Sequence, residues 1–258
     1  MSRTYMHARV DGTEWPDQDI ELPKGQHTAG QAIGILLLDD FYWPFMPGDM
    51  ANASTFDFPV LHKVVEGTEL MQVKNADPAV ADMLIESGRE LERQGVRAIV
   101  GGCGFFGHHQ SRVAAALDVP VVLSSLEQIP LVRRMLRPGR KIGVFSDAHY
   151  LTPALFRASG VEDISDIVVS NSTALPAVQK QQKTGSFNPH RYERQLVDLA
   201  KELVGENPDI GALVAEYTEF PTFAWAVQNA VGLPVFDCST LTRWVHDAVV
   251  RRPIGGFI

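Results

Sequence analysis

The feature that most constrains the fold of this chain is an alternation of short apolar runs with longer amphipathic segments, which starts near residue 32. The runs 32–40, 96–102 and 140–147 are apolar at consecutive positions, which is typical of strands buried on both faces. Segments such as 77–95 lie between the runs and carry apolar residues at helical spacing. Strands that alternate with helices favour parallel sheets covered by helices on both faces, so the pattern predicts an α/β fold.

The same reading predicts the remaining elements. We expect further strands at 119–125, 163–170, 210–217 and 233–239, and further helices at 107–118, 125–136, 148–160, 188–208, 220–232 and 239–250. The chain has 258 residues, of which 45% are hydrophobic and 21% charged. This is the composition of a globular protein, and the length allows one large domain or two medium ones.

The chain also repeats itself at an offset of 114 residues, which places Cys103 over Tyr217. The segment 98–125 then lies over 212–239 without a gap. A gapless match across strand, loop, helix and strand indicates two copies of one α/β unit, although two ordinary βαβ segments can also match by chance.

The repeat predicts two pseudo-symmetric, flavodoxin-like domains, each a three-layer αβα sandwich around a parallel four-stranded sheet. We assign residues 1–30 to an N-terminal extension, 31–135 and 240–258 to the first domain, and 136–239 to the second domain. Open parallel sheets bind ligands at the carboxyl ends of their strands. We therefore expect the active site in the cleft between the domains, with Cys103 and Tyr217 on opposite walls.

Charge and motif content narrow the function classes. A formal net charge of −8 disfavours nucleic acids and anionic membranes as partners. No apolar run approaches the length of a membrane span, and the N-terminus lacks the layout of a signal peptide. Two cysteines are too few for a disulfide framework, and the histidines show no metal-binding spacing, so we expect no metal. A cytoplasmic protein that binds a small molecule is the resulting expectation.

Cys103 lies in a glycine-rich loop between a predicted strand and a predicted helix. The neighbouring glycines allow a tight turn and a close approach to a ligand. The N-terminus of the following helix would lower the pKa of the thiol and attract a carboxylate. Cys103 is therefore a candidate base or nucleophile, and the alternative is a buried structural thiol. Cys238 is expected to be a core thiol within the strand 233–239.

Weaker signals come from polar residues near the predicted cleft. Candidate ligand-binding side chains, which ordinary polar loops explain about equally well, are Asp49, Asn52, Ser54, Thr55, Ser124, Ser125 and Ser146. Ser125 is also a candidate helix N-cap. Candidate anion donors are the backbone amides at Gly104 and Thr218.

Charged and titratable residues near the two loops allow further expectations. At least one of Glu216 and Glu219 should point away from a bound carboxylate or pair with a cation, since like charges repel. His108 and His109 either polarise the thiol or face solvent. A solvated helix face is expected at His190, Arg191 and Arg194.

A Gly-Cys-Gly loop after one strand and a Glu-Xaa-Thr-Xaa-Xaa-Pro loop after the equivalent strand stand at corresponding places of the duplicated halves. In these features the chain resembles the aspartate/glutamate racemase superfamily, which includes hydantoin racemases, maleate isomerases and arylmalonate decarboxylases. Segments 46–60 and 120–130 are also similar, and the likeness covers roughly residues 32–250. The resemblance implies an enzyme without a cofactor, in which two cysteines face each other across the α-carbon of a small carboxylate. It also implies a homo-oligomer, a dimer or higher.

The chain departs from that family at Tyr217, which stands in the place of the second cysteine. A phenol has a reference pKa near 10 and is bulkier than a thiol, but it can still donate a proton or bind an oxyanion. We predict an isomerase of the racemase type, with Cys103 as acid/base and Tyr217 as its partner on the opposite face. Its substrate would be an amino acid, a diacid or a hydantoin-like compound. The alternatives are a single-cysteine lyase, such as a decarboxylase, an isomerase that forms a covalent adduct with Cys103, and an inactive small-acid binding protein.

Overall fold

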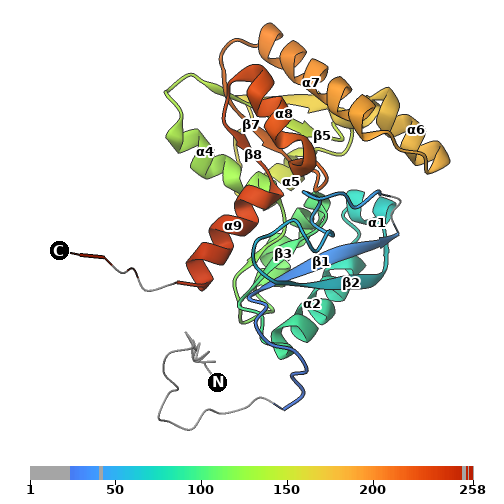
Figure 1. Cartoon of the computed structure of the whole chain (residues 1–258), viewed down its shortest axis with the longest axis vertical. Helices are drawn as coiled ribbons and strands as arrows, with labels where there is room; N and C mark the ends of the chain where they lie inside the picture. Colours follow the sequence, from blue (N-terminus) through green and yellow to red (C-terminus); the bar gives the residue numbers. More distant parts are fainter. Residues whose placement is uncertain (1–23, 41–42, 252–253, 255, 258) are drawn as a thin grey trace.

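The computed structural model describes residues 24–40, 43–251, 254 and 256–257. Over these residues the chain forms two four-stranded sheets in which all neighbouring strands are parallel (Figure 1). The first sheet, in the order β2-β1-β3-β4, contains β1 Ile33–Asp40, β2 Val60–Glu69, β3 Ala98–Gly101 and β4 Val121–Val122. The second, in the order β6-β5-β7-β8, contains β5 Lys141–Ser146, β6 Ile167–Asn171, β7 Ile210–Ala215 and β8 Val235–Phe236. The predicted fold class is confirmed.

The internal repeat corresponds to equivalent places in the two sheets. β3 and β7 are both third in their sheets, and β4 and β8 are both fourth. Each of these pairs is related by the offset of 114 residues that aligns the sequence halves, since 212 − 98 and 235 − 121 are both 114. The loops that contain Cys103 and Tyr217 therefore leave equivalent strands at the same end.

Helices follow the strands in both halves. Within the described residues they are α1 Leu70–Lys74, α2 Pro78–Arg93, α3 Gln110–Ala114, α4 Ile129–Met135, α5 Pro153–Ala158, α6 Pro176–Thr184, α7 Pro189–Glu206, α8 Pro221–Val231 and α9 Cys238–Val249. Three short 3₁₀ helices are Gly104–His109, Ser125–Gln128 and Ser172–Ala174. The helices α2 and α7 agree with the predicted segments 77–95 and 188–208, and each begins with a proline after a capping Asp or Asn.

Several local expectations were wrong. The segment after Cys103 is a six-residue 3₁₀ helix followed by the five-residue α3, in place of one helix over 107–118. Cys238 is the first residue of α9 and not part of a strand, although it is buried in the core as expected. The capping residue of the 3₁₀ helix at 125–128 is Ser124, whose hydroxyl accepts from the amide of Leu126, and not Ser125.

Each sheet is covered on both faces. One face of the first sheet packs against α2, and the other, which carries Ile33 and Val100, packs against Leu241 and Val245 of α9. One face of the second sheet packs against α7 and α8. Its other face carries Val144 and Val214, which share a core cluster with residues of α2, α4 and α5.

Two helices cover the sheet of the other half, an arrangement that we call the helix exchange. α4 follows the first sheet in sequence but contacts β5 of the second sheet, and its Arg133 pairs with Asp166 next to β6. Conversely, α9 follows the second sheet but covers the first (Figure 1). Residues 129–135 lie in the range assigned to the first domain, yet their contacts are with the second sheet; the division into domains remains a prediction.

Most of the predicted N-terminal extension, 1–30, lies outside the described residues. Of its described part, the amide of His27 donates to the side chain of Gln94 at the end of α2, with N and O 3.0 Å apart. None of the helices within the described ranges combines the length and apolar character that a membrane span requires.

Candidate active site

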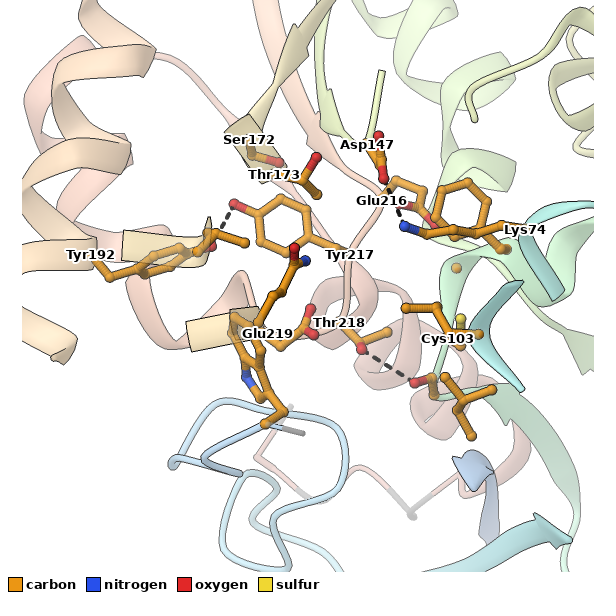
Figure 2. Close-up of a pocket in the computed structure, with 18 residues that line it drawn as sticks. Lys74, Cys103, Asp147, Ser172, Thr173, Tyr192, Glu216, Tyr217, Thr218 and Glu219 are labelled. Carbon is orange, nitrogen blue, oxygen red and sulfur yellow. Dashed lines mark hydrogen bonds and ion pairs between the residues drawn. The ribbon is translucent and has the colours of Figure 1, made fainter. Parts of the chain in front are cut away.

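A cavity that is partly open to solvent lies where the carboxyl ends of both sheets meet. The residues that follow β3, β5, β6 and β7 all contribute to its wall, which is the expected place for a ligand site in open parallel sheets. Its lining residues are Leu38, Trp43, Leu70, Lys74, Gly102, Cys103, Gly104, Phe105, Asp147, Ser172, Thr173, Val178, Gln182, Tyr192, Glu216, Tyr217, Thr218 and Glu219 (Figure 2). Both candidate catalytic residues from the sequence, Cys103 and Tyr217, are among them.

The thiol of Cys103 has a raised pKa, contrary to the expectation from its place before a helix. Cys103 is half-buried because one side faces the cavity. Desolvation by the surrounding protein raises the pKa of the thiol to about 12, the Glu216 carboxylate adds to the rise, and the Phe105 amide and Lys74 oppose it. A six-residue 3₁₀ helix supplies too weak a dipole to outweigh this desolvation. Cys103 is therefore a protonated thiol at neutral pH.

Glu216 lies next to the cysteine loop and is almost completely buried. Its Oε2 accepts a hydrogen bond of 2.7 Å from Ser146, whereas its Oε1 has no hydrogen-bond partner among the residues that the structure describes. Burial raises the pKa of Glu216 to about 7, against the effect of the hydrogen bond from Ser146. A methyl group on Gly104 would lie 2.2 Å from Oε1, so only glycine fits between Cys103 and this carboxyl group.

Glu219 is also buried, and it lines the cavity as well. Burial raises its pKa to about 8, and the charge of Asp49 behind it contributes to the rise. Neither Glu216 nor Glu219 points away from the cavity, contrary to the expectation for at least one of them. Protonation of the two carboxyl groups lessens their repulsion of a bound carboxylate, on which this expectation was based.

Lys74 is the only lysine or arginine among the described residues that line the cavity. Its Nζ lies 2.7 Å from Oδ2 of Asp147, and the side chains are only 10% and 13% exposed. The ion pair links α1 of the first half to the end of β5 in the second half. Nζ also lies 4.8 Å from the ring centre of Tyr150 and 5.6 Å from that of Phe105. This packing holds the positive charge in place beside the cysteine loop.

The hydroxyl group of Tyr217 is directed away from Cys103. It accepts a hydrogen bond of 3.1 Å from the hydroxyl of Tyr192, and Figure 2 shows both hydroxyl groups on the side of the cavity opposite Cys103. Burial raises the pKa of Tyr217 above its usual value. The ring of Tyr217 lines the cavity, and its hydroxyl oxygen is engaged by Tyr192 of the second half of the molecule.

Hydrogen bonds also join the two halves of the molecule next to the cavity. The hydroxyl of Thr218 donates to the carbonyl of Gly102 across the cleft, with the two oxygens 3.2 Å apart. Ser125 donates to the carbonyl of Ala215 at the end of β7, at 2.5 Å. The hydroxyl of Thr218 thus joins the loop of Tyr217 to that of Cys103, and Ser125 joins the segment after β4 to the end of β7.

The remaining predicted site residues lie outside the lining of the cavity. Ser124 is a helix cap, and Ser146 reaches the site through Glu216. Asn52, Ser54 and Thr55 bond within their own loop, and Asp49 accepts from the amide of Ala51 and acts on Glu219 through its charge. His108 and His109 do not line the cavity, and His190, Arg191 and Arg194 are exposed as expected.

Sequence reasoning did not select Lys74, Tyr192 or Trp43. Lys74 belongs to a five-residue helix that carries no motif, and Tyr192 is one of several polar residues at the start of α7. Only the burial rhythm of α7, in which Tyr192, Leu196, Ala200 and Leu203 face inward, distinguishes Tyr192 from its exposed neighbours. No three His, Cys, Asp or Glu side chains of the described residues are arranged as a possible metal site.

Solved structures with similar folds cover most of the chain. Allantoin racemase from Pseudomonas fluorescens superimposes with a TM-score of 0.58 at 14% identity, covering 85% of this chain and 91% of that protein. A glycine-to-cysteine mutant of arylmalonate decarboxylase, with associated sulfate, gives 0.56 at 16% identity over 84% and 92%. The chain has the fold of the aspartate/glutamate racemases. At this level of identity the racemase-like fold is shown, and not the activity.

Curated relatives of this racemase-like chain are more similar in sequence. A dimethylsulfoniopropionate lyase from Durusdinium sp. clade D is 28% identical over 230 residues, which are 86% of this chain and 76% of the relative. Dimethylsulfoniopropionate lyase 3 of Emiliania huxleyi strain CCMP1516 is 30% identical over 248 residues, 92% of this chain and 64% of the relative. The chain thus spans somewhat less than two thirds of the second relative. No protein-family model matches the chain.

Proposed function

We propose that this protein is a lyase that removes a proton from the α-carbon of a small carboxylate and expels a leaving group from the β-carbon. The observation that carries the proposal is the direction of the Tyr217 hydroxyl, which bonds to Tyr192 and does not face Cys103. A two-base racemase needs a second acid on the opposite face of the substrate, whereas an elimination needs one base only. The similarity to dimethylsulfoniopropionate lyases over 86–92% of the chain supports the same choice.

Dimethylsulfoniopropionate carries a dimethylsulfonium group on the carbon next to the α-carbon. Cys103 is a thiol at neutral pH, so it first loses its proton to water in the partly open cavity. The resulting thiolate takes a proton from the α-carbon and becomes a thiol again, so the proton that leaves the substrate replaces the one released to water. The electron pair of the broken C–H bond forms the double bond between the α- and β-carbons. The β-carbon–sulfur bond breaks with its electron pair, and dimethyl sulfide and acrylate leave. The step is balanced without an oxidant, a reductant or a co-reactant.

Lys74 supplies the positive charge that this chemistry requires. Desolvation raises the pKa of the Cys103 thiol to about 12, and the ammonium group of Lys74 opposes this rise, which assists formation of the thiolate. The same charge stabilises the negative charge that develops on a substrate carboxylate as the α-proton departs. Because Lys74 and Asp147 are nearly buried, the attraction between Lys74 and a substrate carboxylate is stronger than it would be in water.

The test is to incubate the purified protein with dimethylsulfoniopropionate and measure dimethyl sulfide by gas chromatography and acrylate by NMR. We expect equal amounts of both products. Cys103→Ser should lower the rate at least about 100-fold, which is the usual contribution of a positioned general base. Cys238→Ser is the matched control, because Cys238 does not line the cavity and a serine hydroxyl can keep the hydrogen bond that the thiol donates to the carbonyl of Thr218, so the rate should be unchanged.

Three results would contradict the proposal. One is full activity of Cys103→Ser. Another is absence of dimethyl sulfide together with racemisation of an amino acid, and the third is the same absence together with carbon dioxide release from a substituted malonate. The small carboxylate is the only partner in this proposal; the homo-oligomeric state and the cytoplasmic location remain predictions from the sequence.

A further inference from the structure

We propose that the aromatic side of the cavity, formed by Trp43, Tyr192 and Tyr217, binds a methylated cationic group of the substrate while Lys74 receives its carboxylate. The inference rests on the proposed function, since it concerns the same cavity, and it names the substrate class. That class is a zwitterion with a sulfonium or quaternary ammonium group at one end and a carboxylate at the other.

The rings on the aromatic side of the cavity pack against one another in a fixed arrangement. The ring centres of Trp43 and Tyr192 are 6.1 Å apart with the planes at 80°, and Phe187 and Phe223 pack against these rings from behind. The hydroxyl groups of Tyr192 and Tyr217 bond to each other. The rings are therefore held rigidly, and their π-systems rather than free hydroxyl groups are available to a ligand. Aromatic surroundings of this kind recognise methylated cations, which have no N–H group to donate.

The positive charge in the cavity lining lies apart from the aromatic side. Lys74 is the only lysine or arginine among the described lining residues, and Figure 2 shows it on the side of Cys103, apart from Tyr192 and Tyr217. Glu219 lies between the two sides and close to the aromatic one. Burial keeps the pKa of Glu219 near 8 in the empty cavity, and a bound cation would favour its ionised form. A cation at the aromatic side thus meets π-systems and a carboxyl group, and no positive charge.

The positions of the two ends of the substrate also fit the proposed reaction. A zwitterion held with its carboxylate at Lys74 and its cationic group at the aromatic side has its α-carbon on the side of Cys103. The bond that breaks in the elimination then points toward the aromatic side. Binding of the cationic leaving group and removal of the α-proton are thereby placed at two ends of one substrate.

The test compares two ligands of the same shape, 3-(trimethylammonio)propionate and 4,4-dimethylpentanoate, which differ by one positive charge. Binding is measured by calorimetry on the full chain carrying Cys103→Ser, so that no turnover interferes. We expect the cationic ligand to bind at least about tenfold more tightly, the value of a desolvated cation–π contact. Trp43→Leu should reduce this preference several-fold, and Trp43→Phe should retain most of it.

Two controls separate the ends of the cavity. Trp225→Leu removes an exposed tryptophan of α8, 75% accessible, and should leave the preference unchanged. Lys74→Met should weaken both ligands by a similar factor, because they share the carboxylate.

Equal affinity for the two ligands would overturn the inference, and so would an unchanged preference in Trp43→Leu. If Trp43→Leu does not fold, as judged by circular dichroism, the comparison of the two ligands still decides. Release of dimethyl sulfide by the unmodified protein is measured separately. An active lyase with no preference for the cation refutes this inference alone, whereas absence of elimination refutes the proposed function.

Discussion

Two buried glutamates, Glu216 and Glu219, determine the electrostatics of the cavity at the scale of single residues. Desolvation raises the pKa of Glu216 to about 7 and that of Glu219 to about 8, well above the ordinary value. The folded protein thus binds these two protons more tightly than the unfolded chain does. A general consequence is that these two carboxyl groups become charged when a ligand or a higher pH favours their ionised form.

The stability contributed by Glu216 depends on pH with a definite sign. Because its folded pKa exceeds the ordinary 4.5, the stabilisation is fully present below about pH 4.5 and is lost as the pH rises through 7. We expect the fall in unfolding free energy between pH 5 and pH 8 to be smaller in Glu216→Gln, by on the order of 2 kcal/mol. Urea denaturation at the two pH values measures it.

The comparison with the unmodified protein isolates Glu216, since all other titrating groups are common to both. Glu202→Gln, on an exposed position of α7, is the matched control and should reproduce the original pH dependence. An identical pH dependence in Glu216→Gln and the unmodified protein would show that the carboxyl group is already ionised at pH 5.

At the scale of elements, β4 is only two residues long; it pairs with β3, and side chains supply further hydrogen bonds. The side chain of Gln110 donates to the carbonyl of Val121 at 2.8 Å and accepts from the amide of Leu123 at 2.9 Å. Glu127 also accepts from the amide of Leu123. Gln110 thus substitutes for part of a neighbouring strand and positions the chain that leads to Ser124 and Ser125.

Removal of this side chain should destabilise the first sheet at its edge. We expect Gln110→Ala to lower the unfolding free energy by about 1–2 kcal/mol, because the carbonyl of Val121 loses its partner. Gln228→Ala, at an exposed position of α8, is the control and should change stability by less than about 0.5 kcal/mol. Equal stability of the two variants in urea denaturation would contradict this role of Gln110.

Strand and helix signals in the sequence differed in how far they determine the elements. Strands in the middle of the sheets, such as β1 and β5, are buried on both faces, and their continuous apolar runs were sufficient to predict them. β2 was not predicted, because it is an edge strand in which exposed polar residues interrupt the apolar pattern. α6 has a mainly polar surface, so its helical rhythm was equally hard to recognise.

The same distinction applies to the site. The loops of Cys103 and Tyr217 could be predicted because the repeat aligns them and parallel strands end at one edge. The direction of the Tyr217 hydroxyl and the pKa of Cys103 depend on Tyr192, Lys74 and the carboxyl groups, which approach from distant parts of the chain. No local pattern contains that information.

At the scale of the whole molecule, the helix exchange joins the two halves. A single core cluster contains residues of both sheets, such as Leu36 and Val144, together with Ile129 of α4. On one face of each sheet a helix from the other half packs. The two halves should therefore unfold together rather than as separate domains.

The measurement is hydrogen exchange followed by mass spectrometry at increasing urea concentration. We expect peptides from β3 and β7 to reach the same opening free energy. Ile129→Ala, which truncates a fully buried side chain, should lower that value by about 3 kcal/mol in both sheets. A loss confined to the second sheet would show that the halves are independent.

The opposed positions of Cys103 and Tyr217 have a stereochemical consequence. A molecule held between them presents one face of its α-carbon to a thiol and the other to an aromatic ring whose hydroxyl is engaged elsewhere. The two hydrogens of an α-methylene group are then no longer equivalent, although the free substrate is achiral. The approximate two-fold symmetry of the fold surrounds an asymmetric pair of faces, so the proposed elimination should remove one prochiral hydrogen selectively.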